Sequence, residues 1–140
     1  MAINGGCLCG SVTYEIDESP VVAMHCHCSI CRRAHGATFG SFAVIPKDKF
    51  RWTSALGDLG RYESAPGNER QFCRQCGSQV TMVEDWNPRG VTICMGSFYD
   101  DPGVLPSGHI FAGSKAPWHE ITDDLPQADT WPPGVGPDAA

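Results

Sequence analysis

Closely spaced cysteines constrain this chain more than any other feature of its sequence. Seven of the eight cysteines fall into three groups, "CLC" at 7–9, "CHCSIC" at 26–31 and "CRQCG" at 73–77, and Cys94 stands apart. In a reducing compartment such spacings are typical of metal ligands or redox groups rather than of disulfides. The fold must therefore gather these groups into sites.

The first and third groups each offer two thiols, which is half of a tetrahedral zinc site. The third group has the form of a zinc knuckle, in which Gly77 takes the positive φ that lets the turn aim N–H groups at the sulfurs. We predict that Cys7, Cys9, Cys73 and Cys76 share one structural zinc, so that metal binding contributes to folding. Buried thiols or a dithiol redox pair are the alternative, although strand-like flanks argue against a thioredoxin-type motif.

The middle group keeps three thiols, Cys26, Cys28 and Cys31, for a second metal. Three protein ligands and one open position are typical of a catalytic zinc. A centre with three thiolates is soft, and a sulfur ligand therefore suits the open position better than a hard oxygen does. We predict that the fourth ligand is the thiolate of a substrate.

Other side chains compete for this fourth position. His25 and His27 are adjacent to the cysteines in sequence, and adjacent residues rarely bind the same metal. Cys94 lies in "GVTICMGSF", an alternating apolar segment, where a cysteine is more often a small core residue. His35 and His109 are more often hydrogen-bonded than catalytic at positions of this kind.

The overall charge excludes several classes of partner. The chain has 10 Lys and Arg against 16 Asp and Glu, with a net charge of −6 and a pI near 5.2. Phosphate contacts require clustered basic residues, so we expect neither nucleic acid nor an anionic membrane surface as a partner. We see no secretory signal and no apolar stretch of the ~20 residues that a membrane-spanning helix needs, and expect a cytoplasmic protein. The oligomeric state is not predicted.

Alternation with period two predicts a mainly β fold. Strands are expected at 11–16, 37–45, 50–53, 60–64, 70–73, 79–84, 91–96 and 109–113, separated by turns rich in Pro, Gly and Asp. The first strand places Val12, Tyr14 and Ile16 on one face. One short helix is expected at 29–35, capped by Ser29. The end of the chain, "TWPPGVGPDAA", is expected to be frayed.

Four segments resemble the glutathione-dependent formaldehyde-activating enzyme family, also known as CENP-V/GFA. They are "GGCLCGSVTYE", "CHCSICRRAHGA", "FCRQCGS" and "HIFAGSKAPWHEI". The resemblance covers residues 5–126 and indicates one domain at 1–126, followed by a Pro/Gly-rich tail at 127–140. It implies an Mss4-like fold of antiparallel sheets with two zinc ions per chain, held by the same two sets of cysteines. The Pro-rich end and His35 depart from the family pattern.

The family's activity implies a zinc-dependent carbon–sulfur lyase that acts on a thiol–aldehyde adduct such as S-hydroxymethylglutathione. The expected partners are therefore a small glutathione-like thiol and an aldehyde. His27 and His35 are candidates for the acid–base group. The candidates for substrate binding are Arg32, Arg33, Lys115 and Trp118, although solvated surface charge and core packing are the competing interpretations. Two other functions stay open: a zinc-stabilised binding module without chemistry, and a redox-sensing zinc–thiolate protein.

Overall fold

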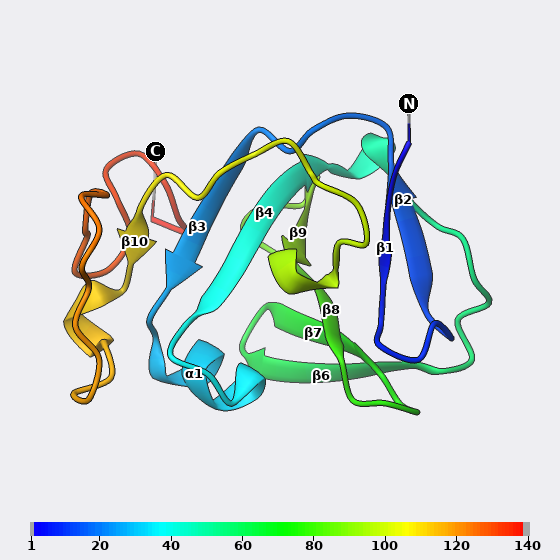
Figure 1. The fold of residues 1–140 in the computed structure, drawn as a ribbon, viewed down its shortest axis with the longest axis horizontal. Coiled ribbons are helices and arrows are strands. Elements are labelled where there is room, and N and C mark those ends of the chain that lie inside the picture. Colours follow the sequence, from blue (N-terminus) through cyan, green and yellow to red (C-terminus); the bar gives the residue numbers. More distant parts are fainter. Residues whose placement is uncertain (1, 139–140) are drawn as a thin grey trace.

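Two β-sheets carry most of the chain in the computed structural model, which describes residues 2–138. A three-stranded sheet has the order β1-β2-β5, and a seven-stranded sheet has the order β10-β3-β4-β9-β8-β7-β6. The small sheet lies at the right of Figure 1, and α1 lies below the end of β3 and the start of β4. Neighbouring strands are antiparallel, except that β10 pairs with β3 in parallel. The prediction of a mainly β fold with antiparallel sheets and one short helix is confirmed.

The described elements are short. The strands are β1 (Ile3–Gly6), β2 (Thr13–Ile16), β3 (Val22–Cys26), β4 (Gly40–Pro46), β5 (Phe50–Trp52), β6 (Leu59–Ala65), β7 (Asn68–Cys73), β8 (Gln79–Glu84), β9 (Gly90–Cys94) and β10 (His109–Ile110). The helix α1 spans Ser29–His35, and single 3-10 turns lie at Lys47–Lys49, Met95–Ser97 and Ala112–Ser114. The helix and the strand at 79–84 have the predicted bounds.

Two strands, β1 and β3, were not predicted. β1 has the sequence "INGG", and its glycines lack the side chains that mark a strand in the sequence. Its sequence is explained by packing: a Cβ atom on Gly5 would lie 2.3 Å from the hydroxyl oxygen of Tyr14. The expected strand at 109–113 ends early at Ile110, because Phe111 adopts a positive φ of 53° and a 3-10 turn follows.

The main hydrophobic core includes residues of both sheets. Val12, Tyr14 and Ile16 are fully buried, as the alternation predicted, and they pack in one cluster with residues of β4, β8 and β9 such as Ile45 and Ile93. The Tyr14 hydroxyl is buried as well, and it forms a 2.7 Å hydrogen bond with Ser97 Oγ. Burial together with this satisfied polar group fixes the small sheet against the large one.

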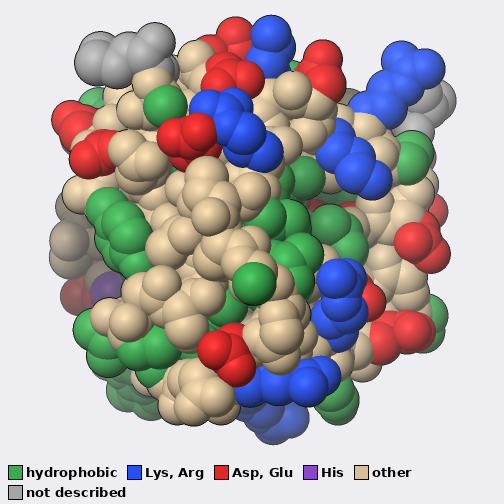
Figure 2. All heavy atoms as spheres, turned by 90° about the vertical axis from the view of Figure 1, so that its right-hand side faces the viewer, with side chains coloured by type: hydrophobic (Ala, Val, Ile, Leu, Met, Phe, Trp, Pro, Cys, Tyr) green, Lys and Arg blue, Asp and Glu red, His purple; other side chains and the backbone are tan. Residues whose placement is uncertain are grey.

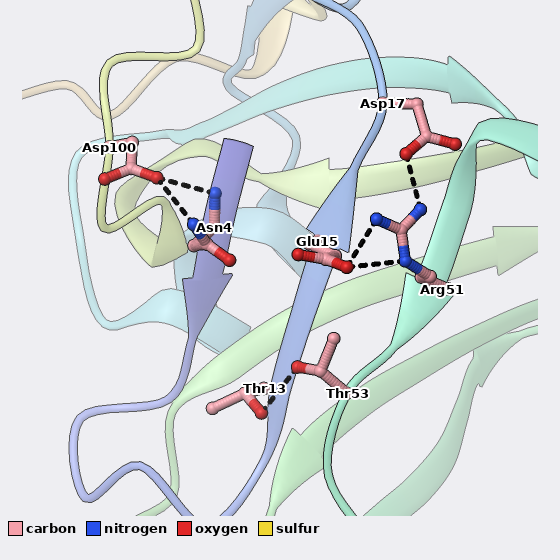
Figure 3. Close-up of polar contacts among 7 residues, drawn as sticks. All are labelled: Asn4, Thr13, Glu15, Asp17, Arg51, Thr53 and Asp100. Atoms are coloured by element: carbon pink, nitrogen blue, oxygen red, sulfur yellow. Dashed lines mark hydrogen bonds and ion pairs between the residues drawn. The ribbon is translucent and has the colours of Figure 1, made fainter. Parts of the chain in front are cut away.

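Polar side chains on the small sheet join neighbouring strands (Figure 3). Arg51 on β5 donates to Glu15 on β2 and to Asp17 just beyond it, and Thr53 Oγ1 donates to Thr13 Oγ1 over 2.8 Å. The Arg51 side chain is 45% exposed, so these ion pairs are screened by solvent. Figure 2 shows basic and acidic side chains intermixed on the face of the molecule at the right of Figure 1. Within residues 2–138, no helix has the length and apolar character needed to cross a membrane.

The described part of the C-terminal tail packs on the domain, so the expectation of a frayed end is wrong for residues 130–138. Phe111 N–H donates to Thr130 O over 2.9 Å, and the Trp131 ring packs edge-on against both Phe111 and Trp86. In Figure 1 this segment lies beside β10 and β3. The cause is aromatic packing, which outweighs the turn-rich composition of the tail. The domain boundary at 126 stays a prediction.

Ile93→Ala is expected to destabilise the fold far more than Arg51→Ala. Ile93 is fully buried in the core, and its truncation should cost about 2–5 kcal/mol of the free energy of unfolding. Arg51 forms solvent-exposed ion pairs, and its removal should cost about 1 kcal/mol or less. Chemical denaturation measures both values, and equal losses would contradict this description of the core.

Candidate functional site

The structure brings the first and third cysteine groups together. The ligand atoms of Cys7, Cys9, Cys73 and Cys76 all lie within 4.8 Å of one another. Cys7 directly follows β1 and Cys73 ends β7, so the cluster joins the N-terminal strand to the turn between β7 and β8. Gly77 has the predicted positive φ, 77°, and its N–H donates to Cys73 O over 2.8 Å.

Hydrogen-bond donors surround these sulfurs. The N–H groups of Val12 and Gln75 donate to Cys7 Sγ and Cys73 Sγ, each over 3.3 Å. Hydrogen bonds from the Ser78 hydroxyl and N–H lower the pKa of the Cys76 thiol to about 5. Donors aimed at sulfur stabilise thiolates, and four thiolates at this separation form a set that can hold one tetrahedral metal ion.

Cys26, Cys28 and Cys31 form a second cluster, again within 4.8 Å of one another. Cys26 ends β3, Cys28 is the N-cap of α1, and Cys31 lies in its first turn. The Cys28 sulfur accepts the Cys31 N–H over 3.2 Å, so the predicted Ser29 cap is wrong. The Cys28 thiol therefore both caps the N-terminus of α1 and belongs to the second cluster.

The environment of the second cluster favours thiolate at Cys28. Hydrogen bonds from the Cys26 and Cys31 thiols lower the pKa of Cys28 to about 2, and the same sharing of protons raises the pKa of Cys26. Arg70 is only 5% exposed, and its Nη2 donates to Cys31 Sγ over 3.4 Å. Arg70 was not predicted as a site residue, because its only signal in the sequence is an arginine within the predicted strand at 70–73.

The proposed rivals for a fourth ligand lie elsewhere. Within the described residues, no other His, Cys, Asp or Glu ligand atom joins the second cluster. His25 Nδ1 hydrogen-bonds to Ser41 Oγ over 2.8 Å, and His27 Nε2 hydrogen-bonds to His109 Nδ1 over 2.8 Å. Cys94 is buried on β9 in the core cluster that includes Cys26 and Cys31, and burial raises its pKa to about 12.

The two histidines predicted for acid–base chemistry have different surroundings. His27 is fully buried in a chain of hydrogen bonds that continues from His109 Nε2 to the Asp123 carboxylate, 3.0 Å away. Burial, together with the neighbouring His109, lowers the pKa of His27 to about 4. His35 packs edge-on against Phe42, and its buried Nε2 has no hydrogen-bond partner within the described part of the chain.

A cavity of ≈ 670 Å³ adjoins the second cluster, because Cys26, Cys28 and Cys31 form part of its wall. Arg70 also lines it, as do the carboxylate-bearing residues Glu84 and Asp85. The larger apolar lining residues are Met24, Phe42, Met82, Trp86, Phe111 and Trp131, which we call the apolar wall. A second cavity of ≈ 410 Å³ is lined by His35 and Cys94.

The predicted substrate-binding residues do not line the larger cavity. Arg32 Nε donates to His27 O, Lys115 Nζ donates to His119 O over 2.6 Å, and Trp118 is 70% exposed. Arg33 is exposed on α1. Neither His27 nor His35 lines this cavity either. The structure thus gathers the predicted cysteines and leaves the predicted acid–base and substrate residues outside the cavity.

A β fold with one four-thiol cluster and one three-thiol cluster beside a cavity defines a class of small, thiol-rich domains that can hold metal ions. The chain belongs to the glutathione-dependent formaldehyde-activating enzyme family, whose model matches residues 2–114. This finding confirms the resemblance seen in the sequence.

Two known proteins are similar to this chain. An uncharacterized lyase of Schizosaccharomyces pombe is 33% identical over 78 residues, which make up 55% of this chain and 54% of that protein. The chain therefore spans about half the length of this curated relative. A crystal structure of a Rhodobacter sphaeroides protein matches with a TM-score of 0.59 and 27% identity, over 74% of this chain and 91% of that chain.

Cys28→Ser protein is expected to bind about one metal ion fewer per chain than the wild type and to stay folded, whereas Cys73→Ser should unfold the domain. Serine at position 28 can still cap α1, so the first substitution tests the sulfur rather than the helix. Metal analysis and circular dichroism measure the two effects. Equal loss of folding in both variants would contradict the division into structural and open sites.

Arg70→Gln is expected to weaken metal retention at the second cluster roughly tenfold, because a charge-assisted hydrogen bond to sulfur is lost. Arg61→Gln is the matched control, since Arg61 is 53% exposed and pairs with Glu69. Competition with a chelator measures retention in both variants. Identical retention would show that Arg70 does not stabilise the thiolates.

Proposed function

We propose that this chain is a zinc-dependent carbon–sulfur lyase that acts on a thiol–aldehyde adduct, with two zinc ions per chain. The family name suggests S-hydroxymethylglutathione as one such adduct. The observation that carries the proposal is the three-thiol cluster at the wall of a cavity, with no fourth protein ligand among the described residues. In this proposal the four-thiol cluster stabilises the fold, and the three-thiol cluster is the site of the reaction.

The proposed reaction involves no redox change. The carbon–sulfur bond of the adduct breaks, its electron pair stays on sulfur, and the carbon–oxygen bond becomes a carbonyl as the hydroxyl proton leaves. A zinc ion held by Cys26, Cys28 and Cys31 would supply a soft Lewis-acid position that favours a thiolate over a thiol. The products are a thiol and an aldehyde, and the reverse reaction forms the adduct.

The protein's own groups prepare this site. The three cysteines arise from the end of β3 and the first turn of α1, and the N-cap hydrogen bond fixes the rotamer of Cys28. Arg70 supplies a buried positive charge next to Cys31, which offsets the excess negative charge of three thiolates. Neither His27 nor His35 lines the cavity, so we assign to water the transfer of the hydroxyl proton to the sulfur, which leaves as a thiol.

Glutathione is expected to bind directly to the metal of the second cluster. In cobalt-substituted protein, titration with glutathione should add a new thiolate-to-metal absorption band and change the ligand-field spectrum, because a fourth sulfur enters the coordination shell. Cys28→Ser protein, which lacks one of the three thiolates, should not show this change. An unchanged spectrum in the wild type would favour the binding module over the enzyme.

A further inference from the structure

Large apolar side chains line the cavity beside the second cluster. Its apolar wall consists of two methionines and four aromatic residues: Met24, Met82, Phe42, Trp86, Phe111 and Trp131. We propose that this wall binds a neutral, apolar group about the size of an aromatic ring, carried by the adduct that the enzyme cleaves. This substrate class rests on the proposed lyase function and makes it more specific.

The cavity is large enough for an adduct that carries a bulky substituent, not only for the adduct of glutathione and formaldehyde. Its volume of ≈ 670 Å³ lies within the range of about 300–1,000 Å³ that is typical of sites for small molecules. In S-hydroxymethylglutathione the formaldehyde half adds only one carbon and one oxygen to the thiol, and this adduct would leave the apolar wall uncovered. Burial of an apolar group against this wall would remove its surface from water, which favours binding.

The charges at the cavity do not suit the charged ends of glutathione. Among the lining residues the cation is Arg70, which already donates to Ser64 Oγ over 3.0 Å and to Cys31 Sγ. Glu84 and Asp85 bring carboxylates to the same lining. Glutathione carries two carboxylates and one ammonium group, so its net charge has the same sign as that of Glu84 and Asp85. Its sulfur can still bind at the second cluster, but its charged groups would then stay in solvent and leave the apolar wall uncovered.

The C-terminal segment builds one side of this cavity. Trp131, Val135 and Pro137 all line it, and they lie beyond the residues 2–114 that the family model matches. The Trp131 ring centroid lies 5.4 Å from that of Phe111 and 5.3 Å from that of Trp86. Gly136 passes directly over the indole, where a Cβ atom would lie 2.5 Å from Trp131 Cγ. This chain therefore completes its cavity with residues outside the matched family region.

The apolar group can belong to either half of the adduct, the aldehyde or the thiol. In both cases the step is the one described above: the carbon–sulfur bond breaks, sulfur keeps the electron pair, and the hydroxyl proton leaves as the carbonyl forms. The apolar wall can bind the same apolar group whether the aldehyde or the thiol carries it. Adducts with the group on each half are therefore needed to tell the two cases apart.

The test uses zinc-loaded wild-type protein and four adducts, made from glutathione or 2-phenylethanethiol with formaldehyde or phenylacetaldehyde. NMR exchange measures kcat/KM for cleavage above the uncatalysed rate. We expect a phenyl group in one half to raise kcat/KM at least about tenfold over S-hydroxymethylglutathione. The half that carries the effective phenyl group identifies the source. Equal or faster cleavage of S-hydroxymethylglutathione would overturn the proposed substrate class and leave the lyase function intact.

Trp131→Ala should remove most of this preference: in this variant kcat/KM for the phenyl adducts should fall about tenfold relative to kcat/KM for S-hydroxymethylglutathione. Leu105→Ala is the control, because Leu105 is 85% exposed and does not line the cavity. A preference that survives in folded Trp131→Ala protein would contradict the role of the C-terminal wall. If this variant does not fold, the comparison of the four adducts on the wild type still decides the substrate class.

Calorimetric titration with 2-phenylethanethiol and with phenylacetaldehyde separates failure of the substrate class from failure of the lyase function. If no adduct is cleaved but one of these compounds binds in a Trp131-dependent manner, the lyase function is wrong and the apolar site stands. If neither compound binds, the apolar site is wrong as well.

Discussion

The convergence of sulfur atoms is the interaction on which the rest of this structure depends. Four thiols from the N-terminal region and from the β7–β8 turn meet within 4.8 Å, and three more meet where β3 passes into α1. Thiolates at this distance repel one another unless a cation or hydrogen-bond donors offset their charge. The first cluster has backbone and serine donors, and the second has the Arg70 guanidinium. The two clusters differ in ligand number, and the chemistry proposed here follows from that difference.

Local signals in the sequence predicted a large part of the fold. The alternation of Val12, Tyr14 and Ile16 identified a core face, and the helix at 29–35 was found with its bounds. The cysteine groups were the strongest signal, because few residue types bind metals and their spacing within each group is local. β1 was missed because its glycines are required by tertiary contacts that the local sequence does not show: Gly5 lies against the Tyr14 side chain, and Gly6 lies against Val12 O and the Tyr99 hydroxyl.

The cavity was not predicted, because it is made of contacts between distant segments. Arg70 on β7 reaches Cys31 on α1, and Trp131 from the tail packs against Trp86 after β8. Two of the basic residues predicted to bind substrate, Arg32 and Lys115, donate instead to backbone carbonyls and do not line the cavity. Family membership predicts the two cysteine clusters, but it does not predict which side chains line the cavity beside the second cluster.

The coordination of the two metals tests the central claim most directly. X-ray crystallography of the zinc-loaded protein, supported by zinc-edge absorption spectroscopy, would determine the ligands of each ion. We expect Cys7, Cys9, Cys73 and Cys76 to complete one site. We expect Cys26, Cys28 and Cys31 to leave one position to water, which a thiol ligand then replaces. A fourth protein side chain on the second metal, such as Cys94 or His27, would contradict this account, as would a disulfide within either cluster.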